Sequence, residues 1–242
     1  MRSTFLRQFY QPTQIWHYGY LQRFYAKNWH QTKLEKLVFP GAKVLDYGCG
    51  NSPYRKVILK QRGDYFGIDI KVTEHGSLFD GIKAPFNDES FDLVVLAEVL
   101  PFAPDSKYLI RECQRLLKQD GMLLVSTSFI YPMIGAEDVF QDGFKFDYFR
   151  YTEAGLSQLL KDDFREVSTE QLGGIGSHLL MYPYYYRNHL MKNKSALKRV
   201  FSFALAPAFL ILTTVLNIFG RMINRLDSSR IFPTDSVAVA KK

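Results

Sequence analysis

Residues 44–53 read VLDYGCGNSP, an apolar run followed by an aspartate and by two glycines two positions apart. The apolar run predicts a buried strand that turns at Gly48 and Gly50, where glycine permits a positive φ and a close approach of a ligand to the backbone. The next predicted strand ends near Asp69, nineteen residues after Gly50. At this spacing a carboxylate meets the hydroxyls of a ribose, so the pattern indicates a nucleoside-binding site at the ends of two strands.

Two kinds of ligand compete for this turn. A dinucleotide site needs a third glycine and a helix N-terminus that receives a pyrophosphate, but Ser52 and Pro53 stand there. Asp46 would repel a phosphate and would accept a hydrogen bond from an ammonium group. A zwitterionic ligand with an adenosine end and no phosphate therefore suits the turn better. The alternative is a turn that only joins a strand to a helix.

The pattern on both sides of the turn alternates short apolar runs with helical spacings. Strands that are apolar on both faces and alternate with helices predict a parallel sheet covered on both sides, hence an α/β fold. The predicted strands cover residues 43–47, 65–70, 91–97, 121–127 and 165–172. The predicted helices cover residues 54–61, 105–117 and 153–160, the last with Thr152 as N-cap, and one or two amphipathic helices within 14–38.

Three further segments resemble a known family. Residues 80–100, DGIKAPFNDESFDLVVLAEVL, resemble the stretch that leads into the fourth strand of class I S-adenosylmethionine-dependent methyltransferases, and residues 111–124, RECQRLLKQDGMLL, resemble the helix, turn and fifth strand that follow. Residues 146–156, FDYFRYTEAGL, resemble a signature of the type 11 group of these enzymes. The resemblance covers about residues 30–172. It implies a Rossmann-like sheet, mostly parallel with an antiparallel last strand, and S-adenosyl-L-methionine as cofactor.

The resemblance also implies roles for single residues. The glycine turn holds the methionine end of the cofactor, Asp69 takes the ribose, and the adenine lies against Ile70 and near Asp80. The whole implied cofactor-binding set is Asp46, Gly48, Cys49, Gly50, Asp69, Ile70, Asp80, Gly81 and Ala97.

Candidate catalytic and acceptor-binding residues are fewer. Pro101-Phe102 stands where many small-molecule members carry Glu-His, so a base must come from elsewhere, and Glu98 and His17 are the candidates. A lone histidine among aromatic residues, such as His17, is more often a packed or surface residue. The candidate acceptor-binding residues are Asp147, Arg150 and Tyr151, which as an alternative form only a loop before the next helix. Neither cysteine has a metal-ligand spacing, so no metal site is predicted.

Charge and composition narrow the class of partner. The 242 residues carry a net charge of +7, and residues 187–242 contain ten Lys and Arg against two Asp. Because a nucleic-acid enzyme usually spreads a basic face over its catalytic domain, no nucleic-acid partner is expected. Hydrophobic residues at 47% and charged residues at 23% exclude collagen-like and disordered classes. Two cysteines and an N-terminus without a long apolar run are typical of a reduced, cytoplasmic protein.

The basic segment surrounds an uncharged run at residues 200–220, VFSFALAPAFLILTTVLNIFG. As a helix it measures about 32 Å, enough to cross a bilayer core of about 30 Å. Three features favour a helix in the membrane interface, or a re-entrant hairpin near Pro207, over a span. Basic residues flank both ends, residues 235–241 resemble a closing strand that must return to the sheet, and a small or polar stripe follows one helix face. The stripe contains Ser202, Ala206, Thr213, Asn217, Arg221 and Asn224. A buried or dimer-forming helix is the alternative.

These expectations combine into one organisation. A helical cover over residues 1–40 precedes a methyltransferase domain at 41–173 and 234–242, and the basic, hydrophobic insertion occupies 174–233. The predicted function is methyl transfer from S-adenosylmethionine, as O-methylation of a glycan, a lipid-linked intermediate or another envelope small molecule at the cytoplasmic face of the cell membrane. The alternatives are a quinone or lipid methyltransferase and a catalytically silent cofactor-binding module anchored to the membrane.

Overall fold

The computed structural model describes residues 14–17, 19–130, 147–179, 181–182, 206–229 and 231–242. The chain divides into two compact units. The sheet unit comprises Asn28–Gln171 and Asp235–Lys242, and the helical unit comprises Met1–Lys27 and Leu172–Thr234. The sequence predicts domain boundaries at residues 40, 173 and 233, which are not the limits of these two units. That predicted division stays a prediction.

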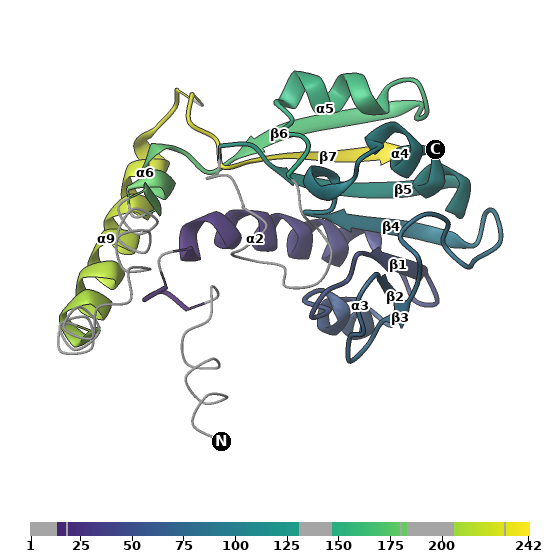
Figure 1. Cartoon of the computed structure of the whole chain (residues 1–242), viewed down its shortest axis with the longest axis horizontal. Helices are drawn as coiled ribbons and strands as arrows, with labels where there is room; N and C mark the ends of the chain where they lie inside the picture. Colours follow the sequence, from purple (N-terminus) through teal and green to yellow (C-terminus); the bar gives the residue numbers. More distant parts are fainter. Residues whose placement is uncertain (1–13, 18, 131–146, 180, 183–205, 230) are drawn as a thin grey trace. The chain divides into compact units, whose positions relative to one another are not determined.

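Seven strands form one sheet in the order β3-β2-β1-β4-β5-β7-β6 (Figure 1). β1 pairs in parallel with β2 and β4, β2 with β3, and β4 with β5, whereas β7 runs antiparallel to β5. This arrangement confirms the predicted α/β fold with a mostly parallel sheet and an antiparallel last strand. The strands are β1 (Lys43–Tyr47), β2 (Asp64–Asp69), β3 (Ser77–Leu78), β4 (Phe91–Ala97), β5 (Leu117–Ser128), β6 (Glu166–Leu172) and β7 (Asp235–Lys241).

Two helices of the sheet unit begin at side-chain caps. Thr152 Oγ1 accepts a hydrogen bond from Gly155 N at 3.0 Å, and Asp105 accepts one from Tyr108 N at 2.9 Å. Such caps satisfy amide groups that the first turn of a helix leaves unpaired. The helices are α2 (Tyr20–Leu37), α3 (Arg55–Lys60), α4 (Ser106–Leu116), α5 (Glu153–Leu160), α6 (Ile175–His178), α9 (Ala206–Leu226) and the short 3₁₀-helix η1 (Leu100–Phe102).

The core explains why β1 and β4 read as nearly continuous apolar runs. Val44 and Leu45 of β1, and Val94 to Leu96 of β4, are fully buried, although their side chains alternate between the two faces of the sheet. Both faces are therefore covered. α4 contributes Ile110, Cys113 and Leu116 to the same core. The central strands are thus held on both sides, which fixes the positions of their carboxyl ends.

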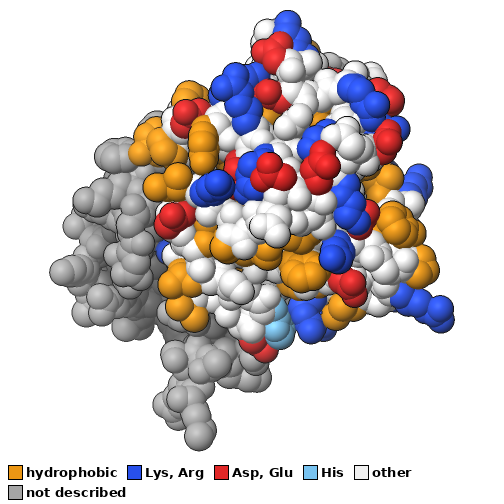
Figure 2. All heavy atoms as spheres, turned by 90° about the vertical axis from the view of Figure 1, so that its right-hand side faces the viewer, with side chains coloured by type: hydrophobic (Ala, Val, Ile, Leu, Met, Phe, Trp, Pro, Cys, Tyr) orange, Lys and Arg blue, Asp and Glu red, His pale blue; other side chains and the backbone are white. Residues whose placement is uncertain are grey.

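Two elements differ from the sequence-based prediction. β5 begins at Leu117 and not at Gly121, because Leu117 adopts an extended backbone at the end of α4 and pairs with Phe91 across an irregularity in the ladder. β3 was not predicted, since its two residues are both exposed and leave no apolar pattern. Figure 2 shows Lys and Arg side chains interspersed with Asp and Glu on one face of the molecule, with hydrophobic side chains between and beside them.

His30 of α2 is a buried side chain that the fold leaves unsatisfied. It lies within the sheet unit, fully buried, with its ring 4.8 Å from the Tyr54 ring and 4.9 Å from Trp29. Within the described part of the chain neither ring nitrogen has a hydrogen-bond partner. Burial lowers the pKa of His30 to about 3, so the ring is neutral near pH 7.

We expect His30→Leu to raise the free energy of unfolding at pH 7 by about 1–3 kcal/mol, because it removes an unpaired polar group from the core. His30 binds protons in the unfolded state below its ordinary pKa of 6.5 but in the folded state only near 3. Protonation of His30 in the unfolded state therefore lowers the free energy of unfolding of the wild type as the pH falls through that window. The variant lacks this histidine and should lose less stability. Urea unfolding between pH 4 and pH 7 measures both effects. His75→Leu, at an exposed histidine, is the control, and equal behaviour of the two variants would contradict the prediction.

Candidate functional site

The carboxyl ends of β1, β2 and β4 meet at one edge of the sheet. β1 lies between the other two, with Asp46 in register with Gly67 of β2 and with Val95 of β4. From β1 the chain continues outward to β2 and β3, and it then returns to add β4 and β5 on the other side. In open α/β sheets such a reversal leaves a crevice beyond the strand ends, where ligands bind.

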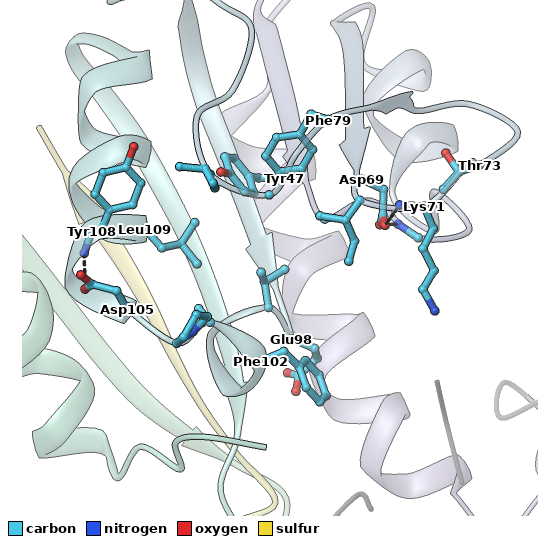
Figure 3. Close-up of a pocket in the computed structure, with 18 of the residues that line it drawn as sticks. Tyr47, Asp69, Lys71, Thr73, Phe79, Glu98, Phe102, Asp105, Tyr108 and Leu109 are labelled. Carbon is cyan, nitrogen blue, oxygen red and sulfur yellow. Dashed lines mark hydrogen bonds between the residues drawn. The ribbon is translucent and has the colours of Figure 1, made fainter. Parts of the chain in front are cut away.

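A cavity of about 560 Å³ occupies this place, within the usual range of about 300–1,000 Å³ for small-molecule sites. Figure 3 shows its labelled side chains on different sides, with Tyr47 and Phe79 facing Glu98 and Phe102 across the space. The lining residues are Tyr47, Gly48, Gly50, Asn51, Asp69, Ile70, Lys71, Val72, Thr73, Phe79, Gly81, Ile82, Glu98, Val99, Phe102, Ala103, Pro104, Asp105, Tyr108 and Leu109.

The glycine turn after β1 has the backbone that the sequence predicts. Gly48 has φ +77° and Gly50 has φ +50°, both in the left-handed region. A Cβ atom at Gly48 would lie 2.5 Å from Val99 Cγ2, so the turn can approach η1 only because this side chain is absent. Gly48 N and Cys49 N both donate to Ile68 O, at 2.9 and 3.0 Å, which fixes the turn against β2.

Asp69 links the two strand ends directly. Its Oδ2 accepts a hydrogen bond from Gly50 N at 2.8 Å, and its Oδ1 accepts one from Lys71 N at 3.0 Å. A carboxylate has about four acceptor positions, so two remain after these contacts. The carboxylate faces the cavity (Figure 3) and can accept further hydrogen bonds from the hydroxyls of a ribose.

Asp46 has a different environment from the one expected. It is almost fully buried and does not line the cavity, and its Oδ2 accepts a hydrogen bond from the Tyr65 hydroxyl at 3.0 Å. Burial raises the pKa of Asp46 to about 7, the Tyr65 hydrogen bond opposes the shift, and the neighbouring charge of Asp69 adds to it. In this structure Asp46 therefore pairs with Tyr65 of β2, and its predicted cofactor-binding role stays a prediction.

Five of the nine predicted cofactor-binding residues line the cavity: Gly48, Gly50, Asp69, Ile70 and Gly81. The other four lie beside it. Cys49 is buried behind the turn, and Ala97 ends β4 one residue before the lining begins. Asp80 turns its carboxylate to the backbone amides of Ile82 and Lys83, at 2.8 and 3.2 Å, and so shapes the loop that presents Gly81.

A buried ion pair holds the loop that follows. Glu112 of α4 accepts hydrogen bonds from Ala84 N at 2.9 Å and from Arg115 at 2.7 Å, while Arg115 also donates to Phe86 O. Burial alone would raise the pKa of Glu112, but the hydrogen bonds from Arg115 and Ala84 hold that pKa below its usual range. The carboxylate therefore stays charged near pH 7 and ties the loop to α4.

Glu98 combines three unusual features at the tip of β4. Its backbone has φ +58°, which is strained for a residue with a side chain. Its Oε2 accepts a hydrogen bond from Ser128 Oγ at 2.5 Å. Its Oε1 is buried and finds no partner among the residues that the structure describes. Glu98 lines the cavity next to Phe102, so a buried, half-paired carboxylate stands beside the space that a ligand would fill (Figure 3).

The remaining predicted residues lie away from the cavity lining. His17 belongs to the helical unit, where its Nδ1 accepts a hydrogen bond from Gly19 N at 2.9 Å, and burial with the charge of Arg23 lowers its pKa to about 4. Asp147 and Arg150 form an ion pair with each other. Tyr151 packs against the hydrophobic core. Their catalytic and acceptor-binding roles stay predictions.

Several lining residues were missed by the sequence analysis. Tyr108 was assigned to the apolar face of its helix, but it is 43% exposed and borders the cavity. Asn51, Phe79 and Phe102 also line the site. An aromatic residue next to a strand end carries no signal that separates packing from ligand contact, so only the fold reveals these positions. No group of three or more His, Cys, Asp or Glu among the described residues could hold a metal ion.

The site fits the cofactor that the sequence resemblance implies. A backbone turn without side chains, a carboxylate with free acceptor positions and apolar side chains together suit an amino-acid end, a ribose and an adenine. The fold and site define a class I methyltransferase domain. Residues 45–125 match the family described as "Methyltransferase domain", type 11, and this match supports the predicted class I methyltransferase of the type 11 group and its cofactor class.

Individual relatives agree with this assignment. The chain is 30% identical over 121 residues to the ubiquinone biosynthesis O-methyltransferase of Aliivibrio fischeri, covering 41% of this chain and 52% of the relative. The chain thus spans about half the length of the curated relatives it matches.

Two solved structures share the fold at low sequence identity. The [4+2]-cyclase SpnF matches with a TM-score of 0.54 at 17% identity, over 89% of this chain and 81% of that one. Phosphoethanolamine N-methyltransferase 2 of Haemonchus contortus, in complex with S-adenosyl-L-methionine, matches with a TM-score of 0.54 at 15% identity, over 89% and 52%.

Two glycine variants test the geometry of the turn. Gly50→Ala should cost about 1–2 kcal/mol of unfolding free energy, because only the left-handed backbone resists the new side chain and nothing lies within 4 Å of its Cβ. Gly48→Ala should cost about 1–3 kcal/mol more, because its Cβ also overlaps Val99. Denaturant unfolding of both variants measures the difference. Equal losses would contradict the close packing of the turn against Val99.

Proposed function

We propose that this protein transfers a methyl group from S-adenosylmethionine to a hydroxyl group of a small, largely apolar acceptor. The observation that carries the proposal is the joint position of Asp69, the glycine turn and Glu98 around one cavity at the strand ends. The type 11 domain match supports methyl transfer as the reaction class. Because the chain spans only about half of its curated relatives, the activity and the acceptor of the whole protein are proposals.

Different residues of the cavity lining would hold different parts of the cofactor and the acceptor. The glycine turn and Asp69 would hold the methionine and ribose portions, and Ile70 and Phe79 would lie against the adenine. When bound, the cofactor supplies a methyl group already activated on a sulfonium. The protein then has to align the acceptor and exclude water, and the apolar side chains of Val99, Phe102 and Leu109 serve both needs.

Glu98 is the residue best placed to take a proton. One of its oxygens accepts a hydrogen bond from Ser128, and the other is buried without a partner in the described chain, in a residue that lines the cavity. A carboxylate held in this way can accept the proton of an acceptor hydroxyl as its oxygen attacks. A base at Glu98 would also take the place of the histidine that many small-molecule members carry, because Phe102 stands at that position in this chain.

The cavity walls favour an apolar acceptor of the quinone type over a glycan. η1 and the start of α4 present Phe102, Ala103, Pro104, Tyr108 and Leu109 to the cavity, with Asp105 turned to the α4 N-terminus. A sugar needs several polar side chains to pair with its hydroxyls. The relatives named ubiquinone biosynthesis O-methyltransferase support the quinone alternative as well. A lipid-linked acceptor with an apolar end fits the same walls.

A catalytically silent module remains the rival proposal. SpnF shares the fold and is named a cyclase, which illustrates that this fold hosts more than one reaction. A silent module has no need for a strained, half-paired carboxylate beside the cavity. Glu98 therefore favours the enzyme, and its substitution separates the two.

Replacing Asp69 tests cofactor binding. Asp69→Ala should weaken S-adenosylmethionine and S-adenosylhomocysteine binding about 5- to 150-fold, because it removes acceptors worth about 1–3 kcal/mol and frees the Gly50 amide. Isothermal titration calorimetry measures the affinity. Asp64→Ala, at the exposed opposite end of β2, is the matched control and should bind normally. Wild-type protein that binds neither ligand would refute the proposed function.

Replacing Glu98 tests the base. Glu98→Gln keeps a hydrogen-bond partner for Ser128 but cannot accept a proton, so turnover of a hydroxylated quinone precursor should fall about 10²- to 10⁴-fold. The cofactor affinity should change by less than about threefold. Thermal unfolding checks that the variant is folded. Full turnover in Glu98→Gln would exclude Glu98 as the base, and His17 would become the next candidate.

A further inference from the structure

The two faces of α9 have the reverse of the usual polarity. Surface helices of globular proteins turn their apolar face to the core and their polar face to water. In α9 the large apolar side chains at spacings of three and four are exposed, from 49% at Ile218 to 82% at Leu226. The exposed stripe, named the α9 stripe below, comprises Ile211, Leu212, Val215, Ile218, Phe219, Met222 and Leu226.

The opposite face of α9 carries polar side chains, and these are buried inside the helical unit. Asn217 is 1% exposed and its Nδ2 donates to Ile15 O at 2.6 Å and to His17 O at 2.9 Å. Asn224 Nδ2 donates to the Tyr25 hydroxyl at 3.1 Å and to Ser177 Oγ at 2.8 Å. Ser202 of the predicted polar stripe lies outside the described residues, but Asn217 and Asn224 of that stripe belong to the packing face, and they fix which side of the helix turns outward.

Close backbone contact fixes the same orientation. A Cβ atom on Gly220 would lie 2.4 Å from Gly176 O, so α9 and α6 approach at a distance that only glycine permits. Arg221 stacks over the Phe24 ring, with its guanidinium carbon 4.5 Å from the ring centroid. Rotating the helix to bury the α9 stripe would break these contacts and the four Asn hydrogen bonds together.

The α9 stripe exposes more contiguous apolar surface than a core helix of a soluble protein does. Among the described residues, Ala208–Leu226 is the one helix that could cross a membrane by length and composition, and only 17% of its apolar window is buried within the protein. A core helix of a soluble protein would be mostly buried. Contiguous exposed apolar surface of this kind marks a contact with a membrane or with another protein.

The charge around α9 selects between these partners. α9 contains Arg221 and Arg225 and no acidic residue. The nearest carboxylate, Asp227, is occupied by the Ser229 amide and hydroxyl and by Ile175 N. Over residues 187–242 ten Lys and Arg stand against two Asp. A helix that combines an exposed apolar stripe with Arg221 and Arg225, within a basic stretch of the sequence, complements the negative surface and the acyl boundary of an anionic bilayer.

We propose that the α9 stripe docks onto the surface of an anionic lipid bilayer, with the helix parallel to the membrane plane. The stripe enters the boundary between headgroups and acyl chains, and Arg225 meets the lipid phosphates at its edge. The helix lies on the bilayer and does not cross it, because β7 follows α9 in the chain and pairs with β5, which precedes it. A single crossing would place these two strands on opposite sides.

Vesicle sedimentation of the full-length protein tests this proposal without reference to catalysis. Wild type should pellet with vesicles of phosphatidylcholine and phosphatidylglycerol and pellet at least about fivefold less with phosphatidylcholine alone. Leu212→Ser/Met222→Ser should lower partitioning onto the anionic vesicles about tenfold or more, since both side chains are exposed members of the stripe. Arg225→Gln should lower it about fivefold, and high salt should release wild type only in part.

A matched double variant controls for general loss of surface apolarity. Leu59→Ser/Leu78→Ser removes two side chains that are 43% and 60% exposed on the sheet unit, against 52% and 55% for Leu212 and Met222. It should pellet like wild type, and circular dichroism should show both double variants folded. Equal loss of vesicle binding in the two double variants would overturn the assignment to the α9 stripe.

Three further results would overturn the proposal. Wild type that remains in the supernatant with anionic vesicles excludes membrane docking. A stable dimer that becomes monomeric in Leu212→Ser/Met222→Ser, with no vesicle binding, assigns the stripe to a second copy of the chain. A tag after Lys242 that protease reaches only after the vesicles are opened, while the sheet unit is accessible outside, establishes a crossing helix. Each outcome leaves the calorimetric test of cofactor binding unaffected.

Discussion

The hydrogen bond from Gly50 N to the Asp69 carboxylate, 2.8 Å long, connects the two strand ends on which the site is built. It can form only because β1 and β2 lie side by side in parallel, with Tyr47 in register with Ile68. The register in turn depends on the buried apolar residues of both strands, since a shift by one residue would turn every side chain to the opposite face. The core thus determines where Asp69 and the glycine turn meet.

The same constraint explains the strain at Glu98. β4 is fixed between β1 and β5 by its buried Val and Leu residues, so its last residues cannot adjust. The chain leaves the strand through a left-handed residue at Glu98 and enters η1 at once. Such a conformation is tolerated where the surrounding structure determines it, and it brings Glu98 to the cavity lining. The packing of the core therefore stabilises the strained backbone at Glu98.

The helical unit follows another rule. Its contacts are made by amide groups and glycines of α9, with Asn217 and Asn224 paired inside and the apolar side chains outside. In water this arrangement leaves apolar surface hydrated, which is unfavourable in proportion to its area. We expect a helix arranged in this way to bury its apolar side chains against a lipid bilayer or another protein. The bilayer proposal rests on this expectation. The chemistry of the sheet unit and the docking of the helical unit are therefore separable by experiment.

The sequence alone determined the α/β fold, the strands at the glycine turn and at Asp69, and the cap at Thr152, because each depends on local spacing and on continuous apolar runs. It also placed five of the nine predicted cofactor residues on the cavity. Only the tertiary structure decided the rest. Asp46 is predicted to hold the methionine end of the cofactor, and only the structure shows that it is buried and paired with the Tyr65 hydroxyl. Phe79 and Tyr108 receive no role from the sequence, yet they line the cavity, and Asn217 of the polar stripe of α9 faces inward. Spacing along a chain specifies which residues share a face, but which neighbour covers that face depends on contacts between residues far apart in sequence.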